Sequence, residues 1–523
     1  MDRSELLGRL GEEVWDVIVV GGGATGLGVA VDAQTRGYRT LLVEQRDFAQ
    51  GTSSRSTKLV HGGVRYLKQG NVSLVVEALR ERGLIYRNAP HLVRDLAFVV
   101  PRYRWWEGPF YGVGLKLYDR LAGELKLAPS RLLDPRQTLA QIPNVETHHL
   151  LGGVMYRDAQ FDDARMALAL ALTAADHGAV LLNYTRVEGL LKGKEMVEGV
   201  RVVDEETRQV HEVKGRVVVN ATGVFADQLR HLDEPSGKPL IAPSQGVHLV
   251  LDAAFQPGEA AIMVPHTDDG RVLFVIPWHQ RVLVGTTDTA MPMPELEPKP
   301  LDEEVDFILR NAARYLRRDP TRADILSAFA GQRPLVQGKK AGRASKAMGR
   351  EHLVLVSPAG LVSVVGGKWT TYRRMAQDTV DAVALVGGLP VRSCATEELR
   401  LHGWMPREEL ETGWEHPLHP YGAERGKVEE LIASDPAWAQ LLHPRLPYLM
   451  GQVVWAARAE MARTLEDVLS RRTRSLLLDA RASVEAAPRV ARVLAKELGR
   501  DEVWEKNQVE EYRRLAAGYV PAG

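Results

Sequence analysis

The chain has 523 residues, 45% of them hydrophobic, with 67 basic and 67 acidic residues and a single cysteine, Cys394. A chain of this length is expected to divide into about two to four domains. Balanced charge excludes a general attraction to nucleic acid, and one cysteine excludes an internal disulfide and a cysteine-based zinc cluster, so we predict neither a nucleic-acid partner nor a metal. The charged segment 1–16 lacks the apolar core of a signal peptide, and no window reaches the roughly 18 apolar residues of a spanning helix. We therefore expect a protein of the cytoplasm or of a membrane surface.

Residues 16–44, DVIVVGGGATGLGVAVDAQTRGYRTLLVE, predict a strand, a glycine turn, a helix and a second strand that ends in an acid. In such a unit Gly21 permits the tight turn, Gly23 lets a pyrophosphate approach the backbone, and Gly26 lets the helix pack close to the strand. Glu44 follows at the distance at which a carboxylate accepts both hydroxyls of an adenosine ribose. The unit predicts dinucleotide binding, and the residues expected to contribute are Gly21, Gly23, Ala24, Thr25, Gly26 and Glu44.

The next segment, GTSSRSTKLVHGGVRYL (51–67), is polar and rich in glycine, which predicts a loop. Thr52, Ser53 and Ser54 can supply hydroxyl and backbone donors to a pyrophosphate and to a flavin ribityl chain, although a solvated loop has the same composition. A distant strand, GRVVVNATGVFAD (215–227), runs into Ala221, Thr222 and Gly223. A strand that ends in small residues can pass close under a bound cofactor.

A third element, residues 352–383, predicts a strand, a turn, a second strand, the pair Gly366 and Gly367, and an amphipathic helix. A double glycine before a helix again offers backbone amides to a ligand. Because the three elements lie far apart in the chain, they indicate a nucleotide-binding domain that is interrupted by an inserted domain.

These motifs resemble the FAD-dependent respiratory glycerol-3-phosphate dehydrogenases, within the glutathione-reductase/amino-acid-oxidase flavoprotein superfamily. The resemblance extends from about residue 14 to the C-terminus, and the glycine motif alone is shared by many unrelated enzymes. The longer loop motif and the last glycine motif are more specific. The segments that carry the resemblance, in order, are VVGGGATGLGVAVDAQTRGYRTLLVE (19–44), GTSSRSTKLVHGGVRYL (51–67), VVNATGVFAD (218–227), GTTDT (285–289), GGKWTTYR (366–373) and EMARTLEDVLSRRTRSLLLDA (460–480).

The resemblance implies hydride transfer from C2 of sn-glycerol 3-phosphate to flavin N5, giving dihydroxyacetone phosphate, with electrons passed to quinone at the membrane. We expect the FAD to be noncovalent. A phosphate-bearing substrate requires basic side chains, because guanidinium groups give phosphate both charge and orientation. By this analogy the substrate site comprises Arg65, Tyr66, Arg333, Arg350 and Lys368, and the cofactor is also held by Gly366, Gly367, Lys368 and Thr370. A surface salt bridge is the commoner fate of any single arginine.

Oxidation of a secondary alcohol requires a base that removes the hydroxyl proton. His248, in SQGVHLVLD, and His61, in KLVHGG, are the two candidates. His248 alternates with apolar residues on a predicted strand, so its side chain could project into a pocket or be a structural histidine bonded to a carbonyl. We favour His248, and His61 could instead contact the flavin. The predicted catalytic residues are His248, Arg333 and His61.

The fold class expected is α/β: an interrupted Rossmann-type FAD-binding domain with an inserted antiparallel β substrate domain and an all-α C-terminal cap domain. Alternating polarity in GVHLVLD and in RVLFVIPWHQRVLVGTTDT predicts the inserted sheet, and apolar spacings of three and four predict the cap helices. Interspersed acids suggest that Arg471, Arg472 and Arg474 form a solvated or interdomain ion-paired face. The predicted limits are FAD-binding domain 1–80, 151–235 and 346–388, helical and aromatic segment 81–150, substrate domain 236–345 and cap domain 389–523.

The segment 101–123, PRYRWWEGPFYGVGLKLYDRLAG, combines aromatic and basic residues. That composition suits a membrane–water boundary, and it equally suits a protein core or a homodimer interface. The resemblance favours a peripheral enzyme at the inner face of the cell membrane.

Three other functions stay open at this point. A glycerol-3-phosphate oxidase would have the same substrate pocket and pass electrons to oxygen. An amino-acid oxidase would need a carboxylate clamp rather than several cations for a phosphate. A flavin-binding protein without turnover would not need Arg333 or Lys368.

Overall fold

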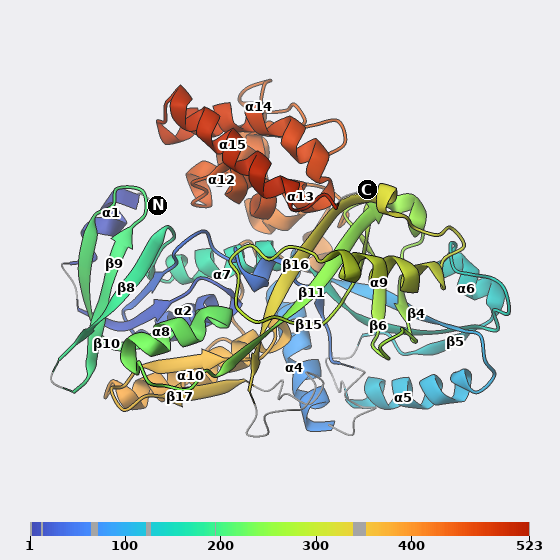
Figure 1. Cartoon of the computed structure of the whole chain (residues 1–523), viewed down its shortest axis with the longest axis horizontal. Helices are drawn as coiled ribbons and strands as arrows, with labels where there is room; N and C mark the ends of the chain where they lie inside the picture. Colours follow the sequence, from blue (N-terminus) through green and yellow to red (C-terminus); the bar gives the residue numbers. More distant parts are fainter. Residues whose placement is uncertain are drawn as a thin grey trace.

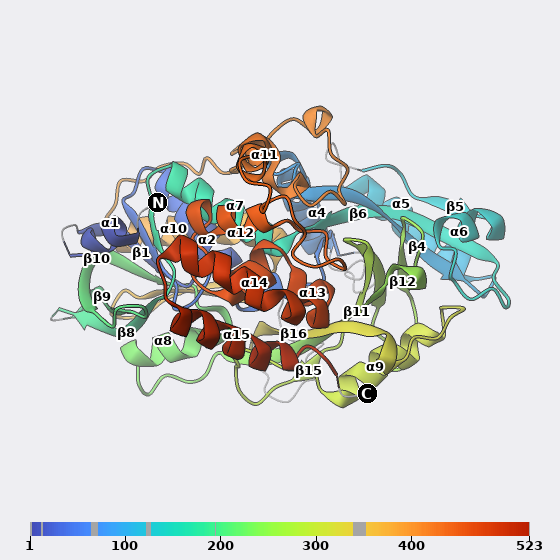
Figure 2. The ribbon, with the colours of Figure 1, turned by 90° about the horizontal axis from the view of Figure 1, so that it is seen from above.

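The computed structural model describes residues 3–11, 14–63, 72–121, 127–193, 195–337 and 352–521. Two sheets lie side by side, one at each end of the long axis, and a group of C-terminal helices covers the region between them (Figures 1 and 2). A functional site is therefore expected where the two sheets and the helical layer meet.

The first sheet is the core of the nucleotide-binding domain. Its order is β17-β18-β10-β1-β2-β7, and all neighbours along it are parallel except β17 and β18. β1 reads WDVIVV and is almost wholly buried, as expected of a strand covered on both faces. The antiparallel strands β8 and β9 extend from β10. The strands are β1 (Trp15–Val20), β2 (Thr40–Val43), β7 (Val180–Leu182), β8 (Thr185–Lys192), β9 (Val197–Asp204), β10 (Val210–Asn220), β17 (Leu353–Val356) and β18 (Val362–Val365).

Helices cover this sheet. The helix α2 (Ala24–Thr35) is rich in alanine, glycine and valine. It is buried along most of its length because it lies between the sheet and two neighbouring helices, α7 and α10. Small side chains allow that close approach. The predicted interrupted nucleotide-binding domain is thus confirmed. The helices of this region are α1 (Arg3–Gly8), α2 (Ala24–Thr35), α4 (Val72–Asn88), α7 (Asp163–Asp176), α8 (Ala226–Asp233) and α10 (Tyr372–Val386), with short 3-10 turns η1 (Thr52–Ser54), η3 (Gly223–Phe225) and η7 (Trp369–Thr371).

The second sheet contains the predicted strands of the inserted domain and is antiparallel, except that β4 and β12 run parallel. These two strands come from distant segments, so no short hairpin forces them to be antiparallel. Strands from residues 59–161 also join this sheet, and the predicted domain limits stay a prediction. The elements are β3 (Leu59–Val60), β4 (Val93–Arg102), β5 (Arg131–Leu133), β6 (Gly152–Phe161), β11 (Ile241–Asp252), β12 (Ala261–Val264), β13 (Leu273–Trp278), β14 (Arg281–Gly285), β15 (Thr289–Ala290), β16 (Ile325–Val336), α5 (Glu107–Leu121), α6 (Pro135–Gln141), α9 (Asp302–Ala313), η4 (Ala253–Phe255) and η5 (Arg322–Asp324).

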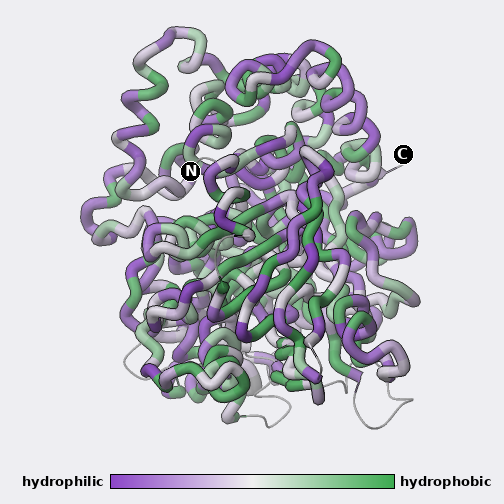
Figure 3. Tube along the Cα trace, turned by 90° about the vertical axis from the view of Figure 1, so that its left-hand side faces the viewer, coloured by the Kyte–Doolittle hydropathy of each residue, from purple (hydrophilic) through white to green (hydrophobic). Residues whose placement is uncertain are grey.

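The C-terminal part is helical, as predicted, and hydrophilic and hydrophobic segments alternate along its helices at the top of Figure 3. Its apolar side chains share one core with Trp278 and Phe329 of the second sheet. The chain then returns to that sheet, where Ala328 N donates to Tyr519 O at 2.8 Å. The cap is therefore anchored on the body. Its elements are η8 (Arg407–Glu409), η9 (His419–Glu424), α11 (Arg425–Ala433), α12 (Met450–Ala459), the π-helical turn η10 (Asp467–Arg472), α13 (Ser475–Leu478), α14 (Ala480–Leu498) and α15 (Glu502–Ala517).

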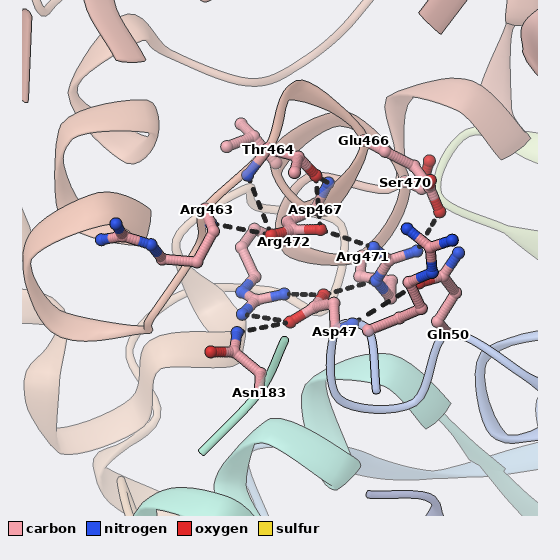
Figure 4. A network of polar contacts seen from close by, with 12 residues as sticks. Asp47, Gln50, Asn183, Arg463, Thr464, Glu466, Asp467, Ser470, Arg471 and Arg472 are labelled. Carbon is pink, nitrogen blue, oxygen red and sulfur yellow. Dashed lines mark hydrogen bonds and ion pairs between the residues drawn. The ribbon is translucent and has the colours of Figure 1, made fainter. Parts of the chain in front are cut away.

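Buried ion pairs join the cap to the loop that follows β2 (Figure 4). Arg471 Nε donates to Asp47 Oδ2 at 2.5 Å, and Arg472 Nη2 donates to Asp47 Oδ1 at 3.0 Å. Burial alone would raise the pKa of Asp47, but the two guanidinium groups hold it below its ordinary value. Arg474 makes a similar pair with Asp163 at the start of α7. The interdomain alternative for these arginines is confirmed.

The aromatic segment 101–123 divides between interior and surface. The side chain of Tyr118 is buried, and its hydroxyl donates to Asp158 Oδ2 at 2.8 Å. Trp105, in the turn before α5, is 80% exposed, and Leu117 on α5 is also exposed. Among the described residues, no helix has the length and apolar character required to cross a membrane.

Candidate functional site

A cleft of about 440 Å³ opens where β1, β2, β10 and β18 end. The carboxyl ends of parallel strands are where nucleotide folds bind their ligands. The three motifs singled out in the sequence converge here from distant parts of the chain. The predicted cofactor residues that line the cleft are Gly21, Gly23, Ala24, Thr25, Glu44, Thr52, Ser53, Ala221, Thr222, Gly223, Gly366, Gly367 and Lys368. Gly26, Ser54 and Thr370 are not part of the lining.

Two glycines of the first motif are required by the geometry of the turn. Gly21 has φ +110°, and a Cβ there would lie 2.6 Å from the carbonyl oxygen of Ala221. A Cβ on Gly26 would lie 1.9 Å from the carbonyl oxygen of Gly21. Gly26 therefore contributes by letting α2 approach the turn, as predicted, and does not itself face the cleft.

The start of α2 faces the cleft. A Cβ on Gly23 would lie 3.1 Å from Ser53 Oγ, which accepts a hydrogen bond from Ala24 N at 2.9 Å. Glu44 Oε2 accepts from Gly22 N at 2.6 Å, and burial raises the pKa of this carboxyl group. The open glycine backbone, the helix N-terminus and the carboxylate together fit the pyrophosphate and ribose of a dinucleotide.

The last motif also lines the cleft. Gly366 and Gly367 both have φ +78°, a conformation that favours glycine. Trp369, which follows them, donates from Nε1 to Ser53 O at 2.8 Å and so ties this motif to the loop of the second motif. The sequence reading missed Trp369 as a contact of the cleft, although it stands inside the matched segment GGKWTTYR.

Arg333 lies on β16 with its side chain 30% exposed. Its guanidinium donates to Thr287 O at 3.1 Å, to Thr286 Oγ1 at 3.3 Å and to Gln245 O at 3.4 Å. Asp288, predicted only to cap its turn, is 3.5 Å from the same guanidinium and also accepts from Ser244 Oγ. Neutral oxygens and the Asp288 carboxylate thus lie around the guanidinium, which stays partly exposed.

His248 lies on β11 near Arg333 and is 2% exposed. Its ring stacks on Phe329, with centroids 5.1 Å apart, and its Nε2 is 2.9 Å from Thr57 Oγ1. Burial lowers the pKa of His248 well below its ordinary value, and the positive charges of Lys58 and Arg333 lower it further. His248 is therefore a neutral imidazole at neutral pH.

The structure describes some of the remaining predicted site residues and not others. Lys368 lines the cleft, and His61 is half-buried, with Thr370 Oγ1 3.5 Å from its carbonyl oxygen. His61 and His248 are not among the residues that line the cleft. Arg65, Tyr66 and Arg350 lie outside the described residues, so their predicted substrate contacts stay predictions.

A buried lysine beside this site was not singled out from the sequence. Lys58 Nζ donates to Asp163 Oδ2 at 2.7 Å and to Ser54 O at 2.6 Å. Burial lowers the pKa of Lys58 to about 7, against the opposing effect of Asp163. Since Arg474 donates to the other oxygen of Asp163 at 2.6 Å, one carboxylate joins the loop, α7 and the cap.

Comparison with known proteins bears on this site. Residues 16–373 match the family described as FAD dependent oxidoreductase, and residues 362–505 match the C-terminal domain of alpha-glycerophosphate oxidase. The chain is 40% identical to the mitochondrial glycerol-3-phosphate dehydrogenase of Mus musculus, over 96% of this chain and 73% of that protein. The Homo sapiens counterpart is 39% identical, over 98% and 74%.

Solved structures agree with the sequence matches. The glycerol-3-phosphate dehydrogenase from Bacillus halodurans, complexed with FAD, superposes with a TM-score of 0.80 at 31% identity, covering 99% of this chain and 98% of that one. L-alpha-glycerophosphate oxidase from Mycoplasma pneumoniae, with a TM-score of 0.56 and 19% identity, shares the fold. These matches confirm the predicted fold class.

Proposed function

Because this chain belongs to the glycerol-3-phosphate dehydrogenase family of FAD-dependent oxidoreductases, we propose that it oxidises sn-glycerol 3-phosphate to dihydroxyacetone phosphate and passes the electrons to a quinone. The observation that carries the proposal is that Arg333 and His248 lie together on the second sheet, beside the loop that lines the cofactor cleft. The FAD supplies the acceptor for the hydride that leaves C2. The protein supplies binding, orientation and a base.

Arg333 is proposed to bind the substrate phosphate. The Arg333 guanidinium is partly exposed, donates to carbonyl oxygens and lies 3.5 Å from the Asp288 carboxylate, so its planar fork is proposed to exchange these contacts for bidentate contacts with a phosphate. Lys368, at the cleft, adds a second cation. Arg65, Tyr66 and Arg350 complete the proposed set on the strength of the family resemblance alone.

His248 is proposed as the base that takes the proton of the substrate hydroxyl. Its neutral state at neutral pH leaves a lone pair for that proton. His61, which stands in the loop motif, is proposed to contact the cofactor or the substrate rather than to act as the base.

Electron transfer to quinone and a peripheral position at the inner face of the cell membrane are proposed from the family and from α5. Exposed Trp105, just before α5, and exposed Leu117, Lys116 and Arg120 on α5 give this segment the mixture of apolar and basic side chains that suits lipid headgroups. Oxygen is the alternative acceptor, and the match of the C-terminal domain to that of alpha-glycerophosphate oxidase is the observation that keeps it open.

The acceptor is tested by reducing the purified protein with glycerol 3-phosphate under nitrogen and then adding either a soluble quinone or air. We expect fast return of the oxidised flavin spectrum with quinone and slow return with air. Fast return in air, with no advantage for quinone, would make the protein an oxidase. Co-sedimentation with vesicles that contain anionic lipid tests the membrane contact, and exchange of Trp105 and Leu117 for Ser is expected to weaken it.

A further inference from the structure

A proline-rich segment, residues 291–301, runs from the end of β15 to the start of α9 and reaches the cofactor cleft. Its sequence is MPMPELEPKPL, and we call it the proline segment. Leu296, in the middle of the segment, is one of the residues that line the cleft, and it is 39% exposed. The proposed substrate contacts and the proposed base lie elsewhere in the chain.

The proline segment is stiff for a stretch without regular secondary structure. Prolines at positions 292, 294, 298 and 300 each fix one backbone φ angle and restrict the residue that precedes them. A segment restricted in this way has fewer conformations to lose when it is held in one place. Leu296 can therefore be kept at the wall of the cleft at a low cost in conformational entropy.

The first anchor of the proline segment is Arg55, which directly follows the turn η1 of the loop that lines the cleft. Arg55 Nη1 donates to Leu296 O at 3.1 Å, and the guanidinium also pairs with the carboxylate of Glu297. The Arg55 side chain is buried, and although burial alone would lower its pKa, Glu297 holds the pKa above its ordinary value. The loop that lines the cleft thus binds both the main chain at Leu296 and the side chain that follows it.

The second anchor comes from the end of the chain. The Tyr519 hydroxyl donates to Glu297 Oε1 at 2.6 Å, and the Tyr519 carbonyl oxygen accepts from Ala328 N of β16 at 2.8 Å. Burial raises the pKa of Tyr519 well above its ordinary value, so the hydroxyl keeps its proton and remains a donor. The Glu297 carboxylate is therefore held between Arg55 and Tyr519, one residue away from Leu296.

A third contact fixes the other side of Leu296 to the second sheet. Glu295 N donates to Gln332 Oε1 of β16 at 2.9 Å. The carbonyl oxygen of Gln332 accepts from Thr52 Oγ1, in the loop that lines the cleft, at 2.5 Å. The proline segment and that loop are thus attached to the same residue of β16, so they are held at a fixed separation across the cleft wall.

An apolar side chain at the wall of a cleft stabilises a bound ring system by removing apolar surface of both from water. Because the main chain on both sides of Leu296 is already fixed, little further order is lost when such a contact forms. The polar contacts around Leu296 are all made within the protein, through Arg55, Gln332 and Tyr519. The Leu296 side chain is therefore the part of the proline segment that is presented to the cofactor.

We propose that Leu296 is a cofactor-contact residue that retains FAD in the cleft, and that Tyr519 is a positioning residue that holds Leu296 there through Glu297. The inserted β domain thus contributes an apolar contact to the cofactor, and the end of the cap domain keeps that contact in place. Only the binding of FAD is required for this role, so it is independent of the substrate and of the electron acceptor.

The test of the contact compares FAD release from the FAD-loaded variants Leu296→Ala and Leu301→Ala. Leu301 ends the same segment and is 36% exposed, but it is not among the residues that line the cleft. We expect Leu296→Ala to release FAD about 5- to 20-fold faster than wild type, because apolar contact is lost, and Leu301→Ala to stay within about 2-fold. The rate is followed by the absorbance of FAD in the filtrate during continuous ultrafiltration.

The role of Tyr519 is tested by Tyr519→Phe, which removes only the hydroxyl that is bonded to Glu297. We expect FAD release about 2- to 5-fold faster than wild type, since Glu297 loses one of its two partners. The control is Tyr512→Phe, which removes another buried hydroxyl of the cap, bonded to Ser483 Oγ, and should leave the release rate unchanged. The double variant of Leu296→Ala and Tyr519→Phe should release FAD no faster than Leu296→Ala alone, because Tyr519 acts through Leu296.

Three results would overturn the inference: equal release from Leu296→Ala and Leu301→Ala, equal release from Tyr519→Phe and Tyr512→Phe, or additive effects in the double variant. Additive effects would show that Tyr519 acts on the stability of the fold and not through Leu296. None of these measurements uses glycerol 3-phosphate, so their outcome is distinguishable from a failure of the proposed dehydrogenase function, which is tested by flavin bleaching.

Discussion

The arginines of the cap interface and Arg333 of the proposed substrate site differ in what lies around their charge. Arg471, Arg472 and Arg474, which we call the cap arginines, have side chains at most 3% exposed and bond to buried carboxylates. Arg333 is 30% exposed, bonds to neutral oxygens at 3.1 to 3.4 Å and lies 3.5 Å from Asp288. The same residue type thus stands in two different physical settings in one chain.

The difference follows from the cost of burying charge. A buried ion pair contributes little by itself, but removing one partner leaves an uncompensated charge in a medium of low dielectric constant. Arg471 and Arg472 therefore hold the loop between Glu44 and Thr52 in place, because that loop contains Asp47. Arg333 is proposed to turn towards a phosphate at a smaller cost, since its bonds to neutral oxygens are long and its contact with Asp288 is 3.5 Å.

The largest expected effect comes from Asp47→Ala, which leaves Arg471 and Arg472 without their shared carboxylate. We expect a loss of about 3–5 kcal/mol in the free energy of unfolding, measured by urea denaturation, and release of FAD at a lower temperature. Asp381→Asn is the control: Asp381 is 56% exposed, and Arg36 keeps its buried pair with Asp32, so the change should stay below about 1 kcal/mol. Equal effects of the two substitutions would remove the distinction between buried and exposed pairs.

The next effect concerns catalysis. Arg333→Ala should lower kcat/KM for glycerol 3-phosphate about 10³-fold, which corresponds to about 4 kcal/mol, because phosphate charge and orientation are lost together. FAD content and Tm should change little, since the side chain is 30% exposed and its contact with Asp288 is long, at 3.5 Å. Arg333→Lys keeps the charge without the planar fork and should recover about one tenth to one hundredth of the wild-type value. Unchanged kinetics in Arg333→Ala would remove the phosphate assignment.

A smaller effect is expected from pH. His91 is buried at the contact between body and cap, and burial, assisted by the charge of Arg165, lowers its pKa to about 3. Between about pH 6.5 and 3 the unfolded chain binds a proton at His91 that the folded protein does not, so stability is lost as pH falls, by up to about 1.4 kcal/mol per pH unit. His91→Gln should reduce this slope in denaturation curves, and His177→Gln, at an exposed position, should not. A slope unchanged by His91→Gln would place the acid sensitivity elsewhere.

The smallest effect is expected at an exposed pair. Arg80 and Glu397 are 2.8 Å apart, with side chains 56% and 41% exposed. Arg80→Ala should cost less than about 1 kcal/mol in the free energy of unfolding, and added salt should reduce the cost further. A loss comparable to that of Asp47→Ala would show that burial does not govern these pairs.

Local patterns were sufficient for the parts of the fold that depend on local chemistry. Gly21, Gly26 and Glu44 could be placed because a strand, a turn and a helix of one short segment build that half of the cleft, and the cap helices followed from apolar spacing. The pairing of Asp47 with Arg471 and of Thr57 with His248 could not be predicted, because a single sequence gives no information on which distant residues meet.

Burial was equally hard to infer within an aromatic segment. Tyr118 and Trp105 have similar sequence surroundings. The Tyr118 hydroxyl nevertheless bonds to buried Asp158, whereas the Trp105 ring faces solvent. The burial of Tyr118 depends on β6, because this strand supplies Asp158. No local sequence pattern connects β6 to residues 101–123.

The most direct test of the account is flavin absorbance under nitrogen during titration with sn-glycerol 3-phosphate, and in parallel with glycerol. We predict that the phosphorylated substrate bleaches the oxidised flavin band, that glycerol at the same concentration does not, and that Arg333→Ala needs far more substrate for the same bleaching. An oxidised spectrum that persists in the presence of glycerol 3-phosphate would contradict the proposed dehydrogenase.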